Sequence, residues 1–513
     1  MSIIAAKSNR SNLSVWVALV LLFIGTLGAY QVVGLNQALL FLVGGALGMT
    51  LYHASFGFTS SWRVFIKEQR GRGLRAQMIM LALAVLLFFP ALGAGELFGH
   101  PVEGFVSPLS TSVVIGAFIF GIGMQLGGGC ASGTLYTVGG GSARMLVTLL
   151  FFCLGSLIAT THLDWWFNLP HLAPISIVSS LGVVPALMVS FALFALIAAI
   201  TIIFEKKRHG TLEVEPKPQD IGFKRFLRGP WPLIWGGILL TLLNFATLSL
   251  AGRPWGVTSA LAVWAAKIAS SVGVDVASWA YWQQPANAKA LSESLWFDIT
   301  SMMNFGIMLG ALLAASLAGK FAPNFHIAKR SLIAAVIGGL LLGYGARLAY
   351  GCNIGAYFSG IASGSLHGWL WLIFAFIGNA LGVKLRPIFF PDERPEAEVH
   401  AHGAHQRTGE IAHPKDGEVE HGMLGTQFHP HKGRKTQQTH SHGGQRRHAA
   451  KTGIGALRHK ERQAEYREGQ RDDARKIQRD GLGVMRFLHG DGGKKESQRG
   501  NQHVYPEYPA PVR

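Results

Sequence analysis

Apolar runs of about twenty residues, the length that a helix needs to cross a bilayer core, recur along this chain between residues 13 and 387. Only 14% of all residues are charged, whereas soluble domains usually carry about a quarter. The runs are continuous and do not alternate with period two, which excludes a β-barrel. The sequence therefore predicts an all-α polytopic membrane protein.

We expect about ten transmembrane helices, near residues 13–34, 36–55, 76–97, 110–128, 144–161, 175–204, 232–250, 297–319, 331–350 and 369–387. The first run is longer than the apolar region of a signal peptide and lacks a clear small-residue cleavage site. It is therefore expected to be a retained span.

One motif, G-x-G-x-x-L-x-x-G-C-x-x-G, occurs twice, at residues 121–133 and 343–355. Two of the three cysteines, Cys130 and Cys352, stand at matched positions of this motif. The segment FGFTS at residues 56–60 also has a counterpart, WGVTS, in the second half. Since two motifs repeat in the same order, the sequence indicates an internal duplication.

The charges in the loops orient the two repeats. Short loops rich in Lys and Arg are expected to be cytoplasmic, and these lie near residues 67–75, 205–228 and 319–330. The first repeat then begins outside and the second begins inside, so two inverted-topology repeats are expected. The same bias explains much of the net charge of +18 without nucleic acid as a partner.

The expected segments are an N-terminal segment with the first span (1–35), the first repeat (36–161), a connecting span (162–204), a basic cytoplasmic linker (205–230), the second repeat (231–388) and a His-rich tail (389–513). The prolines and charges of the linker predict a solvated connector. The tail lacks apolar periodicity and is expected to be disordered. Its histidines have no fixed metal-binding spacing, and a frame error or a fused gene fragment is an alternative origin for it.

Glycines interrupt the apolar run just before each repeated cysteine, and we expect short re-entrant half-helices to follow. Inverted repeats are common in transporters, whose substrate sites lie near the midplane at broken helices. The free N–H groups and the positive dipole end of a half-helix favour an anion. The sequence thus predicts substrate-binding residues at Cys130, Cys352, Gly129 and Gly351.

Cations within apolar stretches are a second indication, because intramembrane charges are costly and usually mark a pathway or a paired partner. Arg347 lies five residues before Cys352 and is predicted to bind substrate. Lys267 has the alternative of snorkelling to an interface. Four residues near turns are expected to be solvated or interfacial: His53, Arg63, Arg144 and His367.

Other residues of the same regions are expected to serve packing. Gly121, Gly123, Gly343 and Gly345 suit close helix contacts, and Cys153 suits a small apolar packing position. The cysteines lack CxxC spacing, so neither disulfides nor a zinc site is predicted. The spans hold no paired carboxylates, nucleophile triad or metal-ligand set, so no enzyme activity and no cofactor are predicted.

The duplicated cysteine motif, with the F-x-x-T and G-x-T-S elements, resembles the YeeE/YedE family of bacterial inner-membrane proteins over about residues 36–387. The members of that family that are understood take up thiosulfate, and others are linked to sulfur or selenium metabolism. The resemblance implies that Cys130 and Cys352 pass thiosulfate along by S–H···S contacts without covalent chemistry. It also implies an inner-membrane location and a cytoplasmic sulfur-carrier or sulfurtransferase as partner. Lys7 and Arg10 predict a cytoplasmic N-terminus, and the loop charges predict a cytoplasmic tail.

The family often has a further cysteine in a pattern like R-F-C-x-T-G, where this chain has Gly57. We include Gly57, Thr59 and Thr258 of these elements in the predicted site. The missing thiol leaves open slower thiosulfate transport or a different small sulfur anion. An alternative function is a non-transporting membrane partner or anchor for a sulfur- or selenium-metabolism enzyme, in which the glycines serve packing alone.

Overall fold

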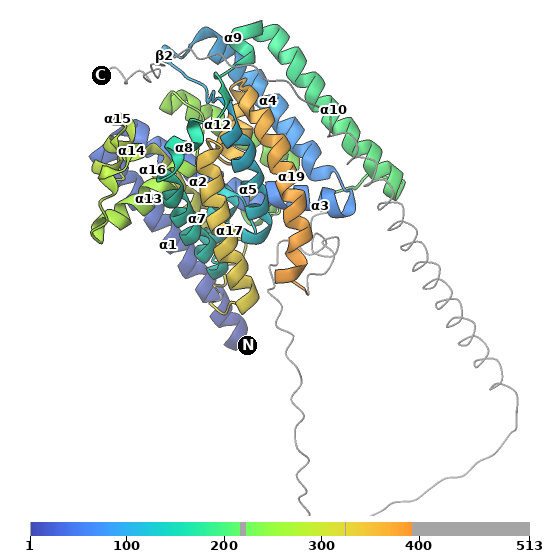
Figure 1. The fold of residues 1–513 in the computed structure, drawn as a ribbon. Coiled ribbons are helices and arrows are strands. Elements are labelled where there is room, and N and C mark those ends of the chain that lie inside the picture. The colour runs from blue at the N-terminus through green and yellow to red at the C-terminus, as the bar shows by residue number, and fades with distance from the viewer. Residues whose placement is uncertain (1, 216–221, 324, 392–513) are drawn as a thin grey trace, which may run out of the picture. The chain divides into compact units, whose positions relative to one another are not determined.

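The computed structural model of the chain describes residues 2–215, 222–323 and 325–391 (Figure 1). Within these ranges, ten helical segments are long and apolar enough to cross a membrane. The prediction of an all-α polytopic membrane protein is confirmed. The tail, from residue 392 on, and residues 216–221 of the linker lie outside the described residues, so the predictions made for them are not tested.

The helices of the N-terminal half are α1 (Ser2–Val32), α2 (Leu35–Ala54), α3 (Phe58–Glu68), α4 (Arg72–Ala94), α5 (Thr111–Gly127), α6 (Ala131–Gly139), α7 (Ala143–Thr160), α8 (Leu163–Phe167), α9 (Ile177–Leu181) and α10 (Val183–His209). Those of the C-terminal half are α11 (Phe223–Arg228), α12 (Leu233–Ala251), α13 (Thr258–Ser271), the 3₁₀ turn η1 (Val276–Ser278), α14 (Ala280–Gln283), α15 (Pro285–Ser292), α16 (Ile299–Leu317), α17 (Lys329–Leu348), the π-helix η2 (Asn353–Ser359), α18 (Gly360–Ala362) and α19 (Leu366–Phe389).

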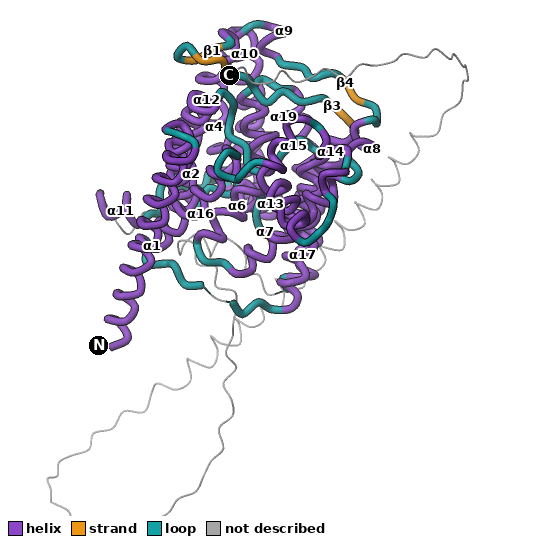
Figure 2. The backbone as a smooth tube through the Cα atoms, turned by 90° about the vertical axis from the view of Figure 1, so that its left-hand side faces the viewer, coloured by secondary structure: helices purple, strands orange, loops and turns teal. Residues whose placement is uncertain are grey.

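Two antiparallel pairs of short strands complete the described structure. Strand β1 (Glu96–Leu97) pairs with β2 (His100–Pro101), and β3 (Leu109–Ser110) pairs with β4 (His171–Leu172). Figure 2 shows both pairs near one end of the helical bundle, whereas the N-terminus of α1 lies at the opposite end.

The two halves contain the same order of long and short helices. In the first, α2, α3 and α4 are followed by α5, α6 and α7; in the second, α12, α13 and α16 are followed by α17, η2 and α19. A short helix therefore follows each copy of the cysteine motif and each copy of the F-G-F-T-S or W-G-V-T-S element.

Helices α5 and α17, which carry the two copies of the cysteine motif, cross in backbone contact. A Cβ atom at Gly123 would lie 3.0 Å from Gly338 O, and one at Gly345 would lie 2.6 Å from Gly116 O. Gly123 and Gly345 are equivalent in the repeat, as are Gly116 and Gly338. Since the end of each helix meets the start of the other, the two helices run antiparallel, which is the relationship that inverted repeats require.

A second pair of equivalent glycines packs against the helices that end each half. A Cβ atom at Gly121 would overlap Ala375 O on α19, and one at Gly343 would overlap Phe152 O on α7. The prediction that Gly121, Gly123, Gly343 and Gly345 serve packing is therefore confirmed. Cys153, also on α7, is partly buried against two apolar clusters, as expected.

The helices α1 and α10 lie at the edges of the bundle, where α1 packs on α2 and α16, and α10 packs on α4 and α9. The connecting span begins later than predicted, at Val183, because the short helix α9 precedes it. The prediction of a fully solvated linker is wrong at its first residues. Helix α10 continues to His209, and the Glu205 side chain is buried because two arginines pair with it.

Candidate functional site

Cys130 and Cys352 occupy the same place in the two halves, the N-cap of a short helix. Cys130 precedes α6, and its Sγ accepts a hydrogen bond from the Gly133 N–H at 3.5 Å. Cys352 precedes η2, and its Sγ accepts one from the Ile354 N–H at 3.4 Å. Each thiol therefore lies where the helix dipole is positive, and both are buried.

The structure brings the two thiols into one region of the core. Helices α6 and η2 contact each other, and both cysteines belong to the main apolar cluster. Arg347 lies in the last turn of α17, five residues before Cys352. The two predicted cysteines and the predicted cation thus share one neighbourhood.

The backbone at both breaks is irregular, as the glycines predict. Gly128 has φ +91°, and its repeat equivalent, Tyr350, has φ +55°. Non-glycine residues are strained in this left-handed region, and such strain gathers at functional sites. Gly351 has φ +151°, and a Cβ atom there would lie 2.8 Å from Ala356 N, so only glycine fits. At Gly129 a Cβ atom would meet Met145 Cε at 3.1 Å.

Arg347 and Gln125 stand at equivalent positions, five residues before the cysteines. Arg347 Nη2 donates to Thr258 Oγ1 at 3.1 Å, and its Nη1 donates to the Tyr281 hydroxyl at 3.4 Å. Gln125 Nε2 donates to Thr59 O at 3.2 Å. Both predicted threonines therefore contact the helix that precedes a repeated cysteine, and only one of the two contacts carries a charge.

Gly57 is the N-cap of α3, with an extended backbone (φ −110°) that accommodates any residue. A Cβ atom at this position would lie 2.5 Å from Ser60 Oγ, so a larger residue displaces that hydroxyl. Thr59, two residues further on, is buried, and its hydroxyl has no hydrogen-bond partner within the described ranges. An unsatisfied buried hydroxyl is available to a ligand.

Two residues of this region were missed by the sequence analysis. Gln125 has a detectable signal, because alignment of the two motif copies places it opposite Arg347. Asn353, directly after Cys352, is fully buried, and among described residues neither atom of its amide has a hydrogen-bond partner. Leaving a buried polar group unpaired costs about 1–3 kcal/mol, which makes this amide a candidate ligand-binding group.

The expectation that His53 and His367 are solvated or interfacial is wrong. Their exposed fractions are 2% and 1%. His367 Nε2 lies 3.3 Å from Ala349 O, and the equivalent residue, Arg144, donates from Nη2 to Leu126 O at 2.7 Å. Each side chain therefore hydrogen-bonds a carbonyl at the end of the broken helix in its own half. This contact explains why His367 is buried.

The two remaining cations are held by specific partners. Lys267 Nζ donates to Leu291 O at 2.6 Å and to Glu293 O at 2.5 Å, between α13 and the segment that follows it. Arg63 Nη1 donates to Gln125 Oε1 at 3.2 Å. The ammonium of Lys267 is therefore occupied by carbonyl oxygens, while Arg63 lies beside the predicted site.

The fold and the site define a class: a polytopic membrane protein in which two broken helices, each with a cysteine at the break, meet in the core. A family model described as sulphur transport matches residues 53–381. The chain belongs to this family. The resemblance noted from the motifs is thereby confirmed, and membership of a transport family implies that the protein is not an enzyme.

Similar proteins carry matching names. The chain is 29% identical over 351 residues to the thiosulfate transporter TsuA of Spirochaeta thermophila, covering 66% of this chain and 95% of that protein. It is 24% identical over 348 residues to TsuA of Escherichia coli, covering 66% and 91%. It is 32% identical over 161 residues to the probable transporter YedE of Escherichia coli, covering 31% and 39%.

Proposed function

We propose that this chain imports thiosulfate, or a closely related small sulfur-containing anion, along a pathway lined by Cys130 and Cys352. The observation that carries the proposal is the pair of buried thiols at the N-termini of two short helices that contact each other. The similarity to proteins named thiosulfate transporters supports the choice of substrate.

The chemistry of the proposed site suits such an anion. Backbone N–H groups at the two helix N-termini offer partial positive charge, and Arg347, five residues before Cys352, adds a full charge. A thiol is a weak hydrogen-bond donor, so each contact holds the anion loosely and releases it to the next one. Thr59, Thr258 and the Asn353 amide supply further polar groups along the proposed pathway.

The proposed setting follows from the pattern of loop charges. The two halves, residues 36–161 and 231–388, act as inverted repeats, and the N-terminus and the tail lie on the cytoplasmic side of a bacterial inner membrane. Arg347 then lies in the outer half of the pathway and Cys130 in the inner half. A cytoplasmic sulfur-carrier or sulfurtransferase is the proposed recipient of the imported anion.

Uptake into proteoliposomes tests this function. Purified full-length protein is reconstituted, and entry of radiolabelled thiosulfate is measured with excess unlabelled thiosulfate, sulfite or sulfate. We expect protein-dependent uptake that unlabelled thiosulfate suppresses most strongly. Absence of uptake, together with co-purification of a soluble sulfur-handling enzyme, would instead identify a membrane anchor for that enzyme.

A further inference from the structure

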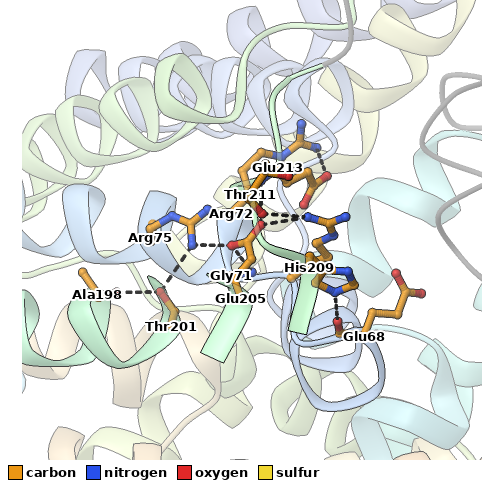
Figure 3. Close-up of polar contacts among 11 residues, drawn as sticks. Glu68, Gly71, Arg72, Arg75, Ala198, Thr201, Glu205, His209, Thr211 and Glu213 are labelled. Atoms are coloured by element: carbon orange, nitrogen blue, oxygen red, sulfur yellow. Dashed lines mark hydrogen bonds and ion pairs between the residues drawn. The ribbon is translucent and has the colours of Figure 1, made fainter. Parts of the chain in front are cut away.

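The Glu205 carboxylate, near the C-terminal end of α10, is the centre of a buried ionic cluster (Figure 3). Its Oε2 accepts hydrogen bonds from Arg75 Nη1 at 2.6 Å and from the Gly71 N–H at 3.0 Å. Its Oε1 accepts from the Glu213 N–H at 2.6 Å and from Arg70 Nη1 at 3.4 Å. The side chain is 0% exposed. A carboxylate offers about four acceptor positions, so this cluster uses its whole capacity.

The last turn of α10 also holds the last turn of α3. Arg208 Nη1 donates to Lys67 O at 3.0 Å, and His209 Nε2 donates to Glu68 O at 2.7 Å. Carbonyl groups in the last turn of a helix lack partners within that helix, and basic groups there also interact favourably with the helix dipole. We call Glu205, Arg208 and His209 the α10 clasp.

The clasp spans the short turn that connects α3 to α4. Gln69 in this turn has φ +55°, in the left-handed region. A Cβ atom at Gly71 would lie 2.6 Å from Thr201 Cβ, so the backbone of the turn is packed directly on α10. The clasp therefore fixes the final carbonyls of α3, the N–H of Gly71 and the first turn of α4 through Arg75.

Helix α3 connects the clasp to the proposed pathway. At its first turn, Thr59 O accepts a hydrogen bond from Gln125 Nε2 at 3.2 Å. The helix has 11 residues, which corresponds to a rod about 16 Å long. Because a rod of this length is held near both ends, a shift at the clasp displaces Thr59 relative to Gln125.

The second half holds its equivalent helix in a different way. Helix α13 is followed by residues 272–298, a long segment, whereas residues 69–71 suffice after α3. Lys267 of α13 bonds the carbonyls of Leu291 and Glu293 in that segment. The α10 clasp thus holds α3 of the first half, whereas α13 of the second half is held by the segment that follows it.

We propose that Glu205 is a positioning residue for transport: together with Arg208 and His209 it sets the position of α3, and α3 sets Thr59 against the helix that ends at the Cys130 break. The inference rests on the proposed transport function and adds to it an element outside both repeats. Helix α10 then determines how fast the anion passes the first-half break, without touching the anion.

The test uses Glu205→Gln in the full-length chain, which removes the charge and keeps the shape. We expect thiosulfate Vmax per folded transporter to fall about tenfold and KM to change less than about twofold, because misplaced groups slow passage while capture near Arg347 is unaffected. Hydrogen–deuterium exchange of peptides covering residues 58–71 should become faster, with exchange of α16 unchanged. The matched control is Glu213→Gln, which breaks only the 3.5 Å ion pair with Arg72 and should behave as wild type.

A second variant, Arg208→Ala combined with His209→Ala, removes the caps of α3 and leaves Glu205 paired. It should also lower Vmax, by about threefold. If Glu205→Gln does not fold, this second variant is used to decide the test. Wild-type Vmax in the Glu205 variant, or reduced Vmax with unchanged exchange over residues 58–71, would overturn the proposal. If the wild-type protein takes up no thiosulfate, the proposed function fails, and unchanged exchange still overturns the positioning role.

Discussion

Arg347 Nη2 donates a 3.1 Å hydrogen bond to Thr258 Oγ1, and this bond ties the end of α17 to the start of α13. The equivalent residue of the first half, Gln125, bonds the backbone oxygen of Thr59 at 3.2 Å. Each half thus connects its broken helix to its other short helix at the same position of the repeat. In the second half the repeat position itself carries the positive charge, whereas in the first half Arg63 brings one to it, because its Nη1 donates to Gln125 Oε1 at 3.2 Å.

The Arg347→Gln variant tests the role of that charge. A glutamine copies the residue of the first half, but it no longer attracts an anion. We expect KM for thiosulfate to rise about tenfold, the loss typical of a hydrogen bond to a charged group. Initial uptake rates in proteoliposomes measure this. Lys289→Gln, which removes an exposed cation elsewhere, is the control, and an unchanged KM in Arg347→Gln would refute the role.

The Gly57→Cys variant tests the meaning of the missing family thiol. The backbone at Gly57 admits a cysteine, but its Cβ would lie 2.5 Å from Ser60 Oγ. We therefore expect Gly57→Cys combined with Ser60→Ala to raise thiosulfate Vmax above that of Ser60→Ala alone, because one more weak donor shortens the gap between contacts. A lower Vmax in the double variant would show that a thiol at position 57 does not help to pass thiosulfate along the pathway.

The Gly343→Ala variant tests the close contact between α17 and α7. The added methyl group overlaps Phe152 O, and overpacking of this kind costs about 1–3 kcal/mol. We expect a lower unfolding temperature in detergent, measured by intrinsic fluorescence. At Gly256 the nearest atom to an added Cβ is 3.5 Å away, an ordinary contact, so Gly256→Ala is the control. Equal unfolding temperatures for the two variants would contradict the packing role.

The sequence predicted the parts of this protein that repeat. Apolar runs located the spans. The alignment of the two motif copies placed Cys130 and Cys352 at equivalent positions and identified the packing glycines. Residues outside the repeat pattern were harder to interpret. The burial of Glu205 depends on Arg75, which is 130 positions away in the chain, and no local pattern reveals that pair.

Local polarity was also a poor guide near the breaks. His367 looks like a turn residue, yet it is buried because Ala349, on the preceding broken helix, offers a carbonyl that this helix leaves free. The form of the helix after each cysteine was likewise not predictable. It is an α-helix after Cys130 and a π-helix after Cys352, although the motif is the same.

The most direct test of the central claim compares single cysteine variants in one thiosulfate uptake assay. Cys130→Ala, Cys352→Ala and the packing control Cys153→Ala are reconstituted at equal protein density, with insertion checked for each. If the two buried thiols carry the anion, the first two variants lose at least about tenfold in uptake rate, and Cys153→Ala matches the wild type. Wild-type uptake by Cys130→Ala and Cys352→Ala would contradict a pathway lined by these cysteines.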